Sequence, residues 1–412
     1  MRYNKPMHIP NLILGAGPAG LTAAILAARR GLPVTLLDAN PTVGRKLLVT
    51  GSGRANLTNA ALDLTRYVCD DPSWLAALMG QFGHAELLEF LRSIGILTFA
   101  TDDGWTYPRS ESAQAVVDAF DATLRQAGVQ LLLNTHILSM RTIQGGFELA
   151  CDDGRRITCE NLLLAAGGKA YPTLGSQGEL FASLEKLGHS VHPLVPALAP
   201  VTAEMSAWHA LQGVRLDARV TLLLNGSSHL STTGNLILTQ WGLNGPAVMD
   251  LSHAISRHAG ERMELRLNLI FDSEPELRTL LQARRRQAYP LRVLLEAVLP
   301  PKVPPVILAH CQLKADANLC DLSDAQIEQV FSLLKALPFK VTGVRGFEFC
   351  QVTAGGVSLS EVDPLSMSSK IVPHLWLAGE TLDVVGPCGG YNLQFAFSTG
   401  AVAGLSFGGA LW

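Results

Sequence analysis

The sequence lacks closely spaced cysteines. Its seven cysteines contain no Cys-x-x-Cys pair and no Cys-x4-Cys pair. A flavin disulfide reductase needs two neighbouring cysteines to relay electrons, and a zinc site needs grouped ligands, so this spacing argues against both. An odd, dispersed set in a long chain predicts reduced, mostly buried thiols and no bound metal. The cysteines are Cys69, Cys151, Cys159, Cys311, Cys320, Cys350 and Cys388.

Charge is also scarce. Only 16% of the 412 residues are charged, the formal net charge is -3, and 48% are hydrophobic. Such a chain has ample material for two or three cores, and it offers no basic surface for nucleic acid or an anionic membrane. We therefore expect a small-molecule substrate, without a nucleic-acid or membrane partner. The sequence does not predict the oligomeric state.

Residues 7–28 contain no Asp, Glu, Lys or Arg. The apolar part of a signal peptide or a membrane anchor is also free of charged residues. Glycines and prolines interrupt this run in the register of a phosphate-binding loop. We interpret the run as part of the fold. Because no other targeting signal is present, a cytoplasmic location is expected.

The N-terminal glycine motif predicts a dinucleotide site. It is Gly15-Ala16-Gly17-Pro18-Ala19-Gly20, between an apolar run at 9–14 and a helical segment at 18–30. The three glycines permit a tight turn, close approach to a pyrophosphate, and helix–strand packing. Asp38 ends the next apolar run, eighteen residues after Gly20, where a carboxylate binds a ribose hydroxyl. The carboxylate would repel a 2′-phosphate, which argues against NADP at this position.

The C-terminal segment favours FAD as that dinucleotide. Leu375–Ala378 predicts a strand followed by Gly379 and Glu380, a layout suited to the ribityl and phosphate part of FAD. Gly389-Gly390-Tyr391-Asn392 then opens a helix, whose free N–H groups and dipole would stabilise the negative charge of reduced flavin. No second Gly-x-Gly-x-x-Gly follows, so NADH or NADPH, if used, would visit the flavin only transiently. No residue is placed for a covalent link, and non-covalent FAD is expected.

The pattern of the chain predicts an α/β fold with an insertion. Strand and helix signals alternate early, including a helix at 112–126, strands at 129–134, 136–141 and 161–166, and a hairpin of 147–151 with 156–159. After three prolines at 193–200, strand signals at 219–225, 235–240 and 262–269 predict an antiparallel barrel or sandwich, followed by helices with a capping box at Ser323. We expect a discontinuous FAD domain (1–199 and 346–412), a β-barrel (200–272 and 337–345) and a small helical cap (273–336).

Several motifs together resemble the BaiN/YhiN-type bacterial flavoproteins, which include aminoacetone-oxidase-like and bile-acid-reductase-like members. The resemblance covers nearly the whole chain. It implies an NAD(P)/FAD-dependent oxidoreductase with an FAD-binding Rossmann-like domain of two-dinucleotide-binding type, interrupted by a β-barrel and a helical cap. The matching segments are 44–46, 51–59, 166–168, 239–246, 354–357, 379–380 and 389–394.

The resemblance also implies further cofactor-binding residues. Arg45 or Lys46 would offset pyrophosphate charge, and Arg54 and Asn56 would approach the flavin. Ile137 would present backbone groups to adenine. The remaining expected contacts are Ala166, Gly167, Gly168, Gly379, Glu380, Gly389, Gly390, Tyr391, Asn392 and Leu393.

Two departures from the family pattern affect the candidate catalytic residues. Ala55 stands where the family has cysteine, and Gln240 where it has histidine, and neither side chain acts as a general base near pH 7. Trp241 is a candidate roof of the substrate pocket or a barrel-core residue. Cys388 and Arg54 complete the candidates, with an incidental cysteine and a surface ion pair as their respective alternatives.

We expect hydride transfer between a small organic substrate and flavin, with dioxygen or NAD(P)H as the second redox partner. An amine or amino ketone is favoured, because the chain has no dedicated nicotinamide domain. The alternatives are an enone reductase, or an FAD-binding protein with a structural, sensing or tRNA-modifying role. A plain NAD dehydrogenase would leave the C-terminal Gly-Gly-Tyr-Asn helix unexplained.

Overall fold

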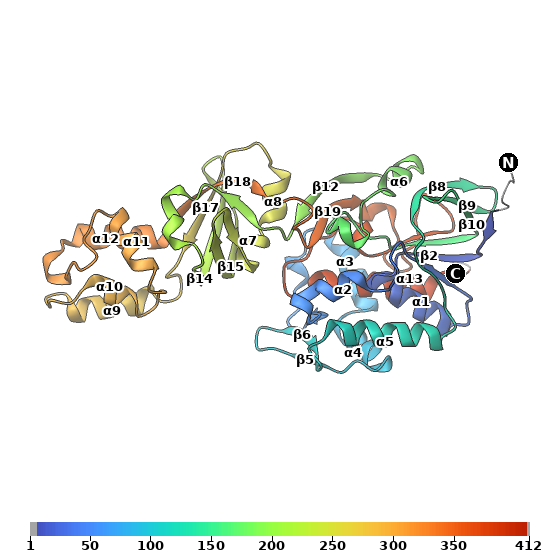
Figure 1. The fold of residues 1–412 in the computed structure, drawn as a ribbon, viewed down its shortest axis with the longest axis horizontal. Coiled ribbons are helices and arrows are strands. Elements are labelled where there is room, and N and C mark those ends of the chain that lie inside the picture. Colours follow the sequence, from blue (N-terminus) through green and yellow to red (C-terminus); the bar gives the residue numbers. More distant parts are fainter. Residues whose placement is uncertain (1–5, 410–412) are drawn as a thin grey trace. The chain divides into compact units, whose positions relative to one another are not determined.

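The computed structural model describes residues 6–409. The chain forms two compact units (Figure 1). The first takes the chain up to Val195 and again from Val352, and the second is Pro196–Gln351. The chain therefore leaves the first unit once and returns to it.

A five-stranded parallel sheet forms the centre of the first unit. Its order is β20-β11-β2-β3-β7. Strands β2, β3, β11 and β20 are almost entirely apolar and buried, as expected for a parallel sheet covered on both faces. The strands are β2 (Asn11–Leu14), β3 (Thr35–Leu37), β7 (Gln130–Leu132), β11 (Asn161–Leu164) and β20 (Leu375–Leu377).

Two helices from opposite ends of the chain pack tightly in this unit. Helix α1 (Pro18–Arg29) follows β2, and α13 (Tyr391–Ser406) is the last helix of the described chain. A Cβ at Gly400 would lie 2.2 Å from the Ala19 carbonyl oxygen, and one at Gly404 would lie 2.5 Å from that of Ala23. Only glycine at these positions of α13 permits this approach to the α1 backbone.

Smaller elements complete the first unit. A second sheet has the order β1-β10-β9-β8, a third β4-β6-β5, and β12 pairs with β19. The strands are β1 (Met7–His8), β4 (Thr58–Asn59), β5 (Thr98–Ala100), β6 (Trp105–Pro108), β8 (Ile137–Ile143), β9 (Gly146–Cys151), β10 (Arg156–Cys159), β12 (Val191–Ala197) and β19 (Val352–Val357). The helices are α2 (Arg45–Val49), α3 (Pro72–Gln81), α4 (His84–Ser93), α5 (Ala113–Gln126) and α6 (Phe181–Lys186).

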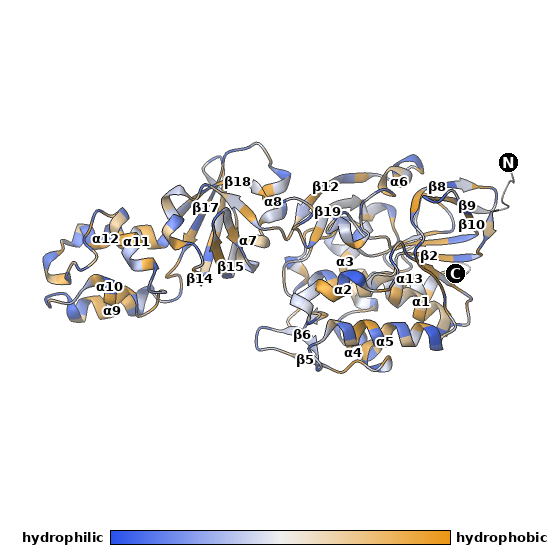
Figure 2. Ribbon diagram, in the orientation of Figure 1, coloured by the Kyte–Doolittle hydropathy of each residue, from blue (hydrophilic) through white to orange (hydrophobic). Residues whose placement is uncertain are grey.

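The second unit contains a closed six-stranded barrel and a set of helices. The barrel order is β13-β16-β15-β14-β17-β18, and buried residues alternate with exposed ones along β14. Hydrophobic and hydrophilic residues mix along the barrel strands and the helices (Figure 2). The strands are β13 (Val201–Ala203), β14 (Arg215–Leu224), β15 (Ser227–Thr239), β16 (Gly242–Asn244), β17 (Met263–Asn268) and β18 (Leu337–Val344); the helices are α7 (Pro246–Met249), α8 (Ser252–Arg257), α9 (Glu274–Arg284), α10 (Leu291–Leu295), α11 (Val303–His310) and α12 (Asp324–Lys335).

This architecture confirms the predicted fold class, an α/β Rossmann-like domain with an inserted barrel and helices. The hairpin of β9 and β10 and the Ser323 capping box are also confirmed. Three predictions of extent were wrong. The apolar run at 9–14 forms a strand only over β2, and the 219–225 strand is the end of the longer β14. The 235–240 strand is likewise the end of the longer β15, whose polar first half pairs with β14.

The barrel unit contains a histidine that titrates unusually. Burial lowers the pKa of His253 to about 4, and the nearby positive charges of Arg257 and His229 lower it further. Between pH 6.5 and about 4 the unfolded chain binds a proton at this position that the folded chain does not. Stability is therefore lost as the pH falls through this window.

We expect His253→Gln to flatten this pH dependence. One pKa unit is worth about 1.4 kcal/mol, so His253 accounts for up to ~3 kcal/mol of stability lost between pH 6.5 and about 4. Urea unfolding of the full chain at pH 7, 5.5 and 4.5 measures the free energy of unfolding of the wild type and of the variant. Equal loss of stability in the wild type and the variant would contradict the assignment.

Candidate functional site

The glycine loop joins β2 to α1 in a conformation that glycine adopts without strain and other residues do not. Gly15 has φ +107°, and a Cβ there would lie 2.3 Å from the Ala165 oxygen. A Cβ at Gly20 would lie 1.8 Å from the Gly15 oxygen. A Cβ at Gly17, in contrast, would meet nothing within 4 Å. The loop is thus packed against the protein on one side and open at Gly17, at the N-terminus of α1, where anions bind.

Asp38 holds this loop against the one that follows β3. Its Oδ2 accepts a hydrogen bond from the Ala16 N–H at 2.6 Å. Its Oδ1 accepts from the Asn40 backbone N–H at 2.8 Å and from Asn40 Nδ2 at 2.9 Å. Arg45 in turn donates to Asn40 Oδ1 at 3.2 Å. The predicted ribose carboxylate and one predicted phosphate cation therefore belong to one hydrogen-bonded loop.

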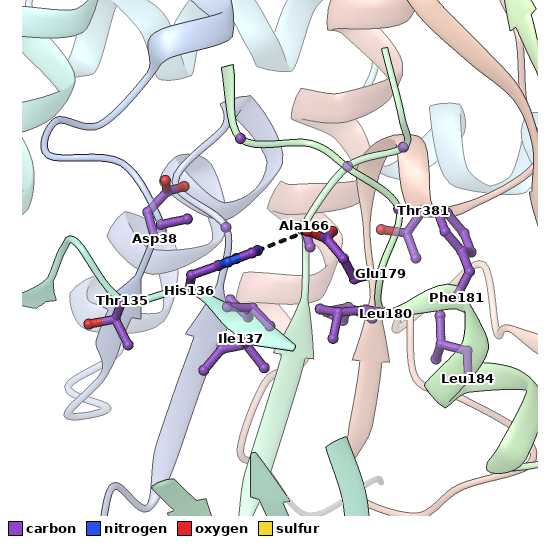
Figure 3. Close-up of a pocket in the computed structure, with 18 residues that line it drawn as sticks. Asp38, Thr135, His136, Ile137, Ala166, Glu179, Leu180, Phe181, Leu184 and Thr381 are labelled. Carbon is purple, nitrogen blue, oxygen red and sulfur yellow. Dashed lines mark hydrogen bonds and ion pairs between the residues drawn. The ribbon is translucent and has the colours of Figure 1, made fainter. Parts of the chain in front are cut away.

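A pocket of about 570 Å³, partly open to solvent, lies where β2, β3 and β11 end. His136 Nε2 and Glu179 Oε1 are 2.8 Å apart within its lining (Figure 3). The lining therefore combines carboxylates, an imidazole, small backbone-exposing residues and apolar side chains. It consists of Leu14, Gly15, Asp38, Ala39, Thr135, His136, Ile137, Leu164, Ala166, Gly167, Gly168, Gly175, Gly178, Glu179, Leu180, Phe181, Leu184 and Thr381.

An ion pair links early and late segments of the chain beside this pocket. Lys46 Nζ lies 2.5 Å from Glu380 Oε2, and both side chains are partly exposed. Glu380 Oε1 accepts from the Thr353 N–H at 2.8 Å. A Cβ at Gly168 would lie 2.4 Å from Thr353 Oγ1 and 2.7 Å from Glu380 Oε1. The positive charge of Lys46 is thus already paired with a carboxylate.

Two buried polar atoms at the site have no partner. Within residues 6–409, Asn56 Oδ1 and Thr381 Oγ1 are the buried side-chain nitrogen or oxygen atoms that make no hydrogen bond. Leaving a buried polar group unpaired costs about 1–3 kcal/mol. Thr381 lines the pocket, and Asn56 is a predicted flavin contact. Both atoms are therefore placed as ligand contacts would be.

The C-terminal helix begins at the predicted position. Gly390, with φ +94°, is the residue before α13, and a Cβ there would lie 2.3 Å from the Thr58 oxygen. Asn392 closes the preceding turn, because its side chain accepts from the Gly386 N–H at 2.9 Å and donates to the Gly386 carbonyl at 2.7 Å. The first N–H groups of α13 have no acceptor within the helix. They can therefore bind a negatively charged group.

The remaining predicted cofactor contacts are held by the surrounding protein. Tyr391 is fully buried, and its hydroxyl accepts from the Asp63 N–H at 3.2 Å. Asn59 Nδ2 donates to the Gly389 carbonyl at 3.0 Å. Leu393 is partly buried against the core, and Gly379 begins a short 3-10 turn.

The candidate catalytic residues are divided between the two units. Arg54 lies 4.6 Å over the Tyr107 ring and 3.6 Å from Glu111, the ion pair that was its alternative role. Cys388 is half-buried beside Gly389. Gln240 and Trp241 belong to the second unit, in the turn between β15 and β16, where Gln240 is exposed and Trp241 lies 5.1 Å from the Arg345 guanidinium.

Several residues at the site escaped sequence reasoning. They are Asn40, Thr135, His136, Glu179, Thr353 and Thr381. Thr353 and Thr381 lie next to motifs that the sequence analysis recognised, and His136 precedes Ile137. Their closeness in sequence to predicted site residues was therefore the signal that could have identified them. Glu179 is 43 residues from His136, and nothing local links the two.

Residues 6–409 contain neither a metal-binding cluster nor a membrane-spanning helix. No group of three or more His, Cys, Asp or Glu side chains there is arranged to hold a metal ion. No helix in the same range is both long and apolar enough to cross a membrane.

Comparison with known proteins identifies relatives across the whole chain. Residues 10–406 match the model of the HI0933-like protein Rossmann domain. A 3-dehydro-bile acid delta(4,6)-reductase of Clostridium scindens is 34% identical over 404 residues, 95% of this chain and 97% of the relative. A ribosomal RNA dihydrouridine synthase of Escherichia coli is 30% identical over 391 residues, 94% and 95% of the two chains.

Among solved structures, the fold resembles a 3-ketosteroid delta1-dehydrogenase of Sterolibacterium denitrificans. The TM-score is 0.51 at 12% identity, covering 96% of this chain and 98% of the other. At this identity the likeness concerns the fold alone.

We expect Gly168→Ala to weaken FAD binding at least about tenfold, or ~1.4 kcal/mol, because the new methyl group would displace Thr353 and Glu380. Isothermal titration of the cofactor-free protein with FAD measures the dissociation constant. Gly80→Ala is the control, because Gly80 lies in α3 with open space at its Cβ position. Equal affinities in the two variants would contradict the assignment of Gly168 to the site.

Proposed function

The chain belongs to the HI0933-like Rossmann-domain family and is an FAD-dependent oxidoreductase, and we propose a reaction for it. In this proposal the enzyme uses NAD(P)H to reduce a carbon–carbon double bond that is conjugated to a carbonyl group. The proposed substrate is a small organic molecule. The observation that carries the cofactor assignment is the pair of unpartnered buried atoms, Asn56 Oδ1 and Thr381 Oγ1, within a cradle of crowded glycines.

The residues of this cradle fit FAD from end to end. The pocket that contains Asp38 and Ile137 would hold the adenosine part. The open face of Gly17 and the N-terminus of α1 would hold the pyrophosphate. Asn56 and the start of α13 would hold the flavin ring. When bound, FAD supplies the ability to accept a hydride from one molecule and give it to another.

The chain's own contribution is orientation and charge. In this scheme the N-terminus of α13 would face the pyrimidine end of the ring, where its dipole and free N–H groups would favour negative charge. Paired with Glu380, Lys46 leaves the pyrophosphate to the backbone N–H groups of the glycine loop. The proposed NAD(P)H has no domain of its own and would use the face that the substrate uses.

The names of the relatives support the choice of substrate class. A bile-acid delta(4,6)-reductase and a dihydrouridine synthase are both named for adding hydrogen across double bonds. In a 3-dehydro-bile acid and in uridine, those bonds are conjugated to a carbonyl. We therefore place a conjugated alkene above the amine or amino ketone that the sequence favoured, which stays an untested prediction.

A uridine within RNA is the second candidate substrate. Two relatives bear the name ribosomal RNA dihydrouridine synthase, at 30% and 27% identity over nearly the whole chain. In the second unit, Arg345 stacks on Trp241 and on the exposed ring of Phe349, an arrangement that suits base stacking. The net charge of -3 and the near-balance of acidic and basic residues favour a small molecule over RNA.

Half-reaction measurements test the proposal. We expect the purified protein to be yellow, to release FAD on heating, and to be bleached anaerobically by NADH or NADPH. Reduced enzyme should then be reoxidised by conjugated enones faster than by saturated ketones of the same shape. Reoxidation only by uridine-containing RNA would favour the second candidate. Bleaching by amines or amino ketones but not by NAD(P)H would overturn the proposal in favour of an oxidase.

We expect Gly390→Ala to expel FAD or to lower its midpoint potential by tens of millivolts. The added Cβ would collide with the Thr58 carbonyl and move the start of α13. A helix terminus contributes up to about 2 kcal/mol, and ~1.4 kcal/mol corresponds to ~30 mV for two electrons. Gly145→Ala is the matched control, since Gly145 has φ +81° but open space. Normal binding with an unchanged potential in Gly390→Ala would refute the placement of α13.

A further inference from the structure

We propose that His192, held by Asp383, donates the proton that completes reduction of the substrate double bond. The inference rests on the proposed function and names a proton donor for it. Such a donor is needed because Ala55 and Gln240 cannot titrate near neutral pH.

The two side chains form an ordered hydrogen-bonded pair. His192 Nδ1 lies 2.8 Å from Asp383 Oδ2. The other carboxylate oxygen, Oδ1, accepts from the Gly355 N–H at 2.8 Å, which fixes the plane of the carboxylate. The Asp383 side chain is only 10% exposed, whereas that of His192 is 42% exposed. The imidazole is therefore anchored on one side and accessible on the other.

The pair lies on the segments that form the cofactor cradle. Asp383 follows Thr381 by two residues and Glu380 by three, and Gly386, which Asn392 binds, follows three residues later. His192 is in β12, beside β19, and a Cβ at Gly355 would lie 2.2 Å from the Pro193 oxygen. The imidazole is thus attached to the turn between Glu380 and the start of α13, the segment to which the proposed function assigns the flavin.

Neighbouring titratable groups are less suited to proton donation. Burial, and then the negative charges of Asp70, Asp71 and Asp383, raise the pKa of the Cys69 thiol. Burial, and then the neighbouring Tyr391 hydroxyl, raise the pKa of Tyr67 well above its ordinary value. Burial lowers the pKa of His84, which bonds Thr58. The raised pKa makes the Cys69 thiol a weaker acid, and the Tyr67 hydroxyl already donates its proton to the Tyr391 carbonyl at 2.8 Å. Burial disfavours the protonated His84 imidazole that would give up a proton.

His192 also differs from the other described histidines of the first unit. It combines a mostly buried carboxylate at Nδ1 with an Nε2 that has no partner among residues 6–409. The others have acidic or polar partners at both ring nitrogens or a neutral partner at one. They are His8, His84, His136, His189 and His374.

The proposed step balances with a reduced nicotinamide as the electron source. The π bond of the alkene breaks, and the carbon β to the carbonyl receives the hydride and its electron pair. The α carbon receives H⁺ from His192 Nε2, so that NAD(P)H, one proton and the alkene become NAD(P)⁺ and the saturated product. Asp383 holds the imidazole through Nδ1, and the ring regains its proton from solvent at its exposed face.

Splitting the half-reactions tests His192 against a merely structural role. In His192→Gln holoenzyme, we expect reduction by NAD(P)H and reoxidation by ferricyanide to keep wild-type rates. Reoxidation by a conjugated enone should slow at least about 100-fold, the usual contribution of a positioned acid. His374→Asn is the control, because the His374 ring is exposed and its Nδ1 bonds the neutral amide of Asn161.

Two further measurements do not depend on turnover rate. In the wild type, a downfield Nδ1–H proton signal is expected by NMR, and it should be absent in Asp383→Asn and in His192→Gln but retained in His374→Asn. In deuterated water, the wild type should label one face of the α carbon, and His192→Gln should label both faces. Asp383 is a positioning residue in this scheme, so Asp383→Asn should slow only the enone step.

The outcomes separate this inference from the proposed function. Suppose that the wild-type enzyme reduces enones. If His192→Gln reduces them equally fast, or if its reoxidation by ferricyanide slows as much as its reoxidation by the enone, His192 is not the donor and the proposed function stands. If wild-type enzyme reduced by NAD(P)H is reoxidised by no conjugated alkene, both are overturned. An Nδ1–H signal that persists in Asp383→Asn overturns the pairing itself.

Discussion

The contact between α1 and α13 is the constraint on which the site depends. Gly400 and Gly404 let the C-terminal helix touch the backbone of α1 at Ala19 and Ala23, more closely than any side chain would allow. The glycine loop lies at the N-terminus of α1, and Gly390 at that of α13. Because the two helices are in close contact, segments about 370 residues apart would both contribute to the proposed cradle.

Hydrogen bonds and an ion pair then hold together the loops that the packing of α1 against α13 brings close. Asp38 ties the glycine loop to Asn40, and Glu380 ties Lys46 to Thr353. Each carboxylate thereby binds two partners from different segments. Most polar groups of the cradle are satisfied before any ligand arrives, and the exceptions, Asn56 Oδ1 and Thr381 Oγ1, show where the protein has left hydrogen-bonding capacity unused.

The sequence predicted the parts of the site that depend on local geometry. Glycines needed at one backbone position, as at Gly15 and Gly390, leave a visible pattern, and buried parallel strands are apolar throughout. Contacts that form only by folding left no such pattern: Glu179 reaches His136, and His192 reaches Asp383, across 43 and 191 residues. Helices α3 and α4 also escaped notice, and the polar half of β15 was missed because its partner strand, rather than its own pattern, orders it.

The pairing of β12 with β19 has an evolutionary consequence. The chain leaves the first unit at the end of β12 and returns at the start of β19, so the second unit is attached through two adjacent strands. An insertion whose two ends meet on neighbouring strands can be lengthened, trimmed or exchanged by recombination without altering the register of the parallel sheet. Selection can then remodel the barrel and its helices while the cofactor chemistry is inherited unchanged, a route by which one ancestral scaffold diversifies its substrates.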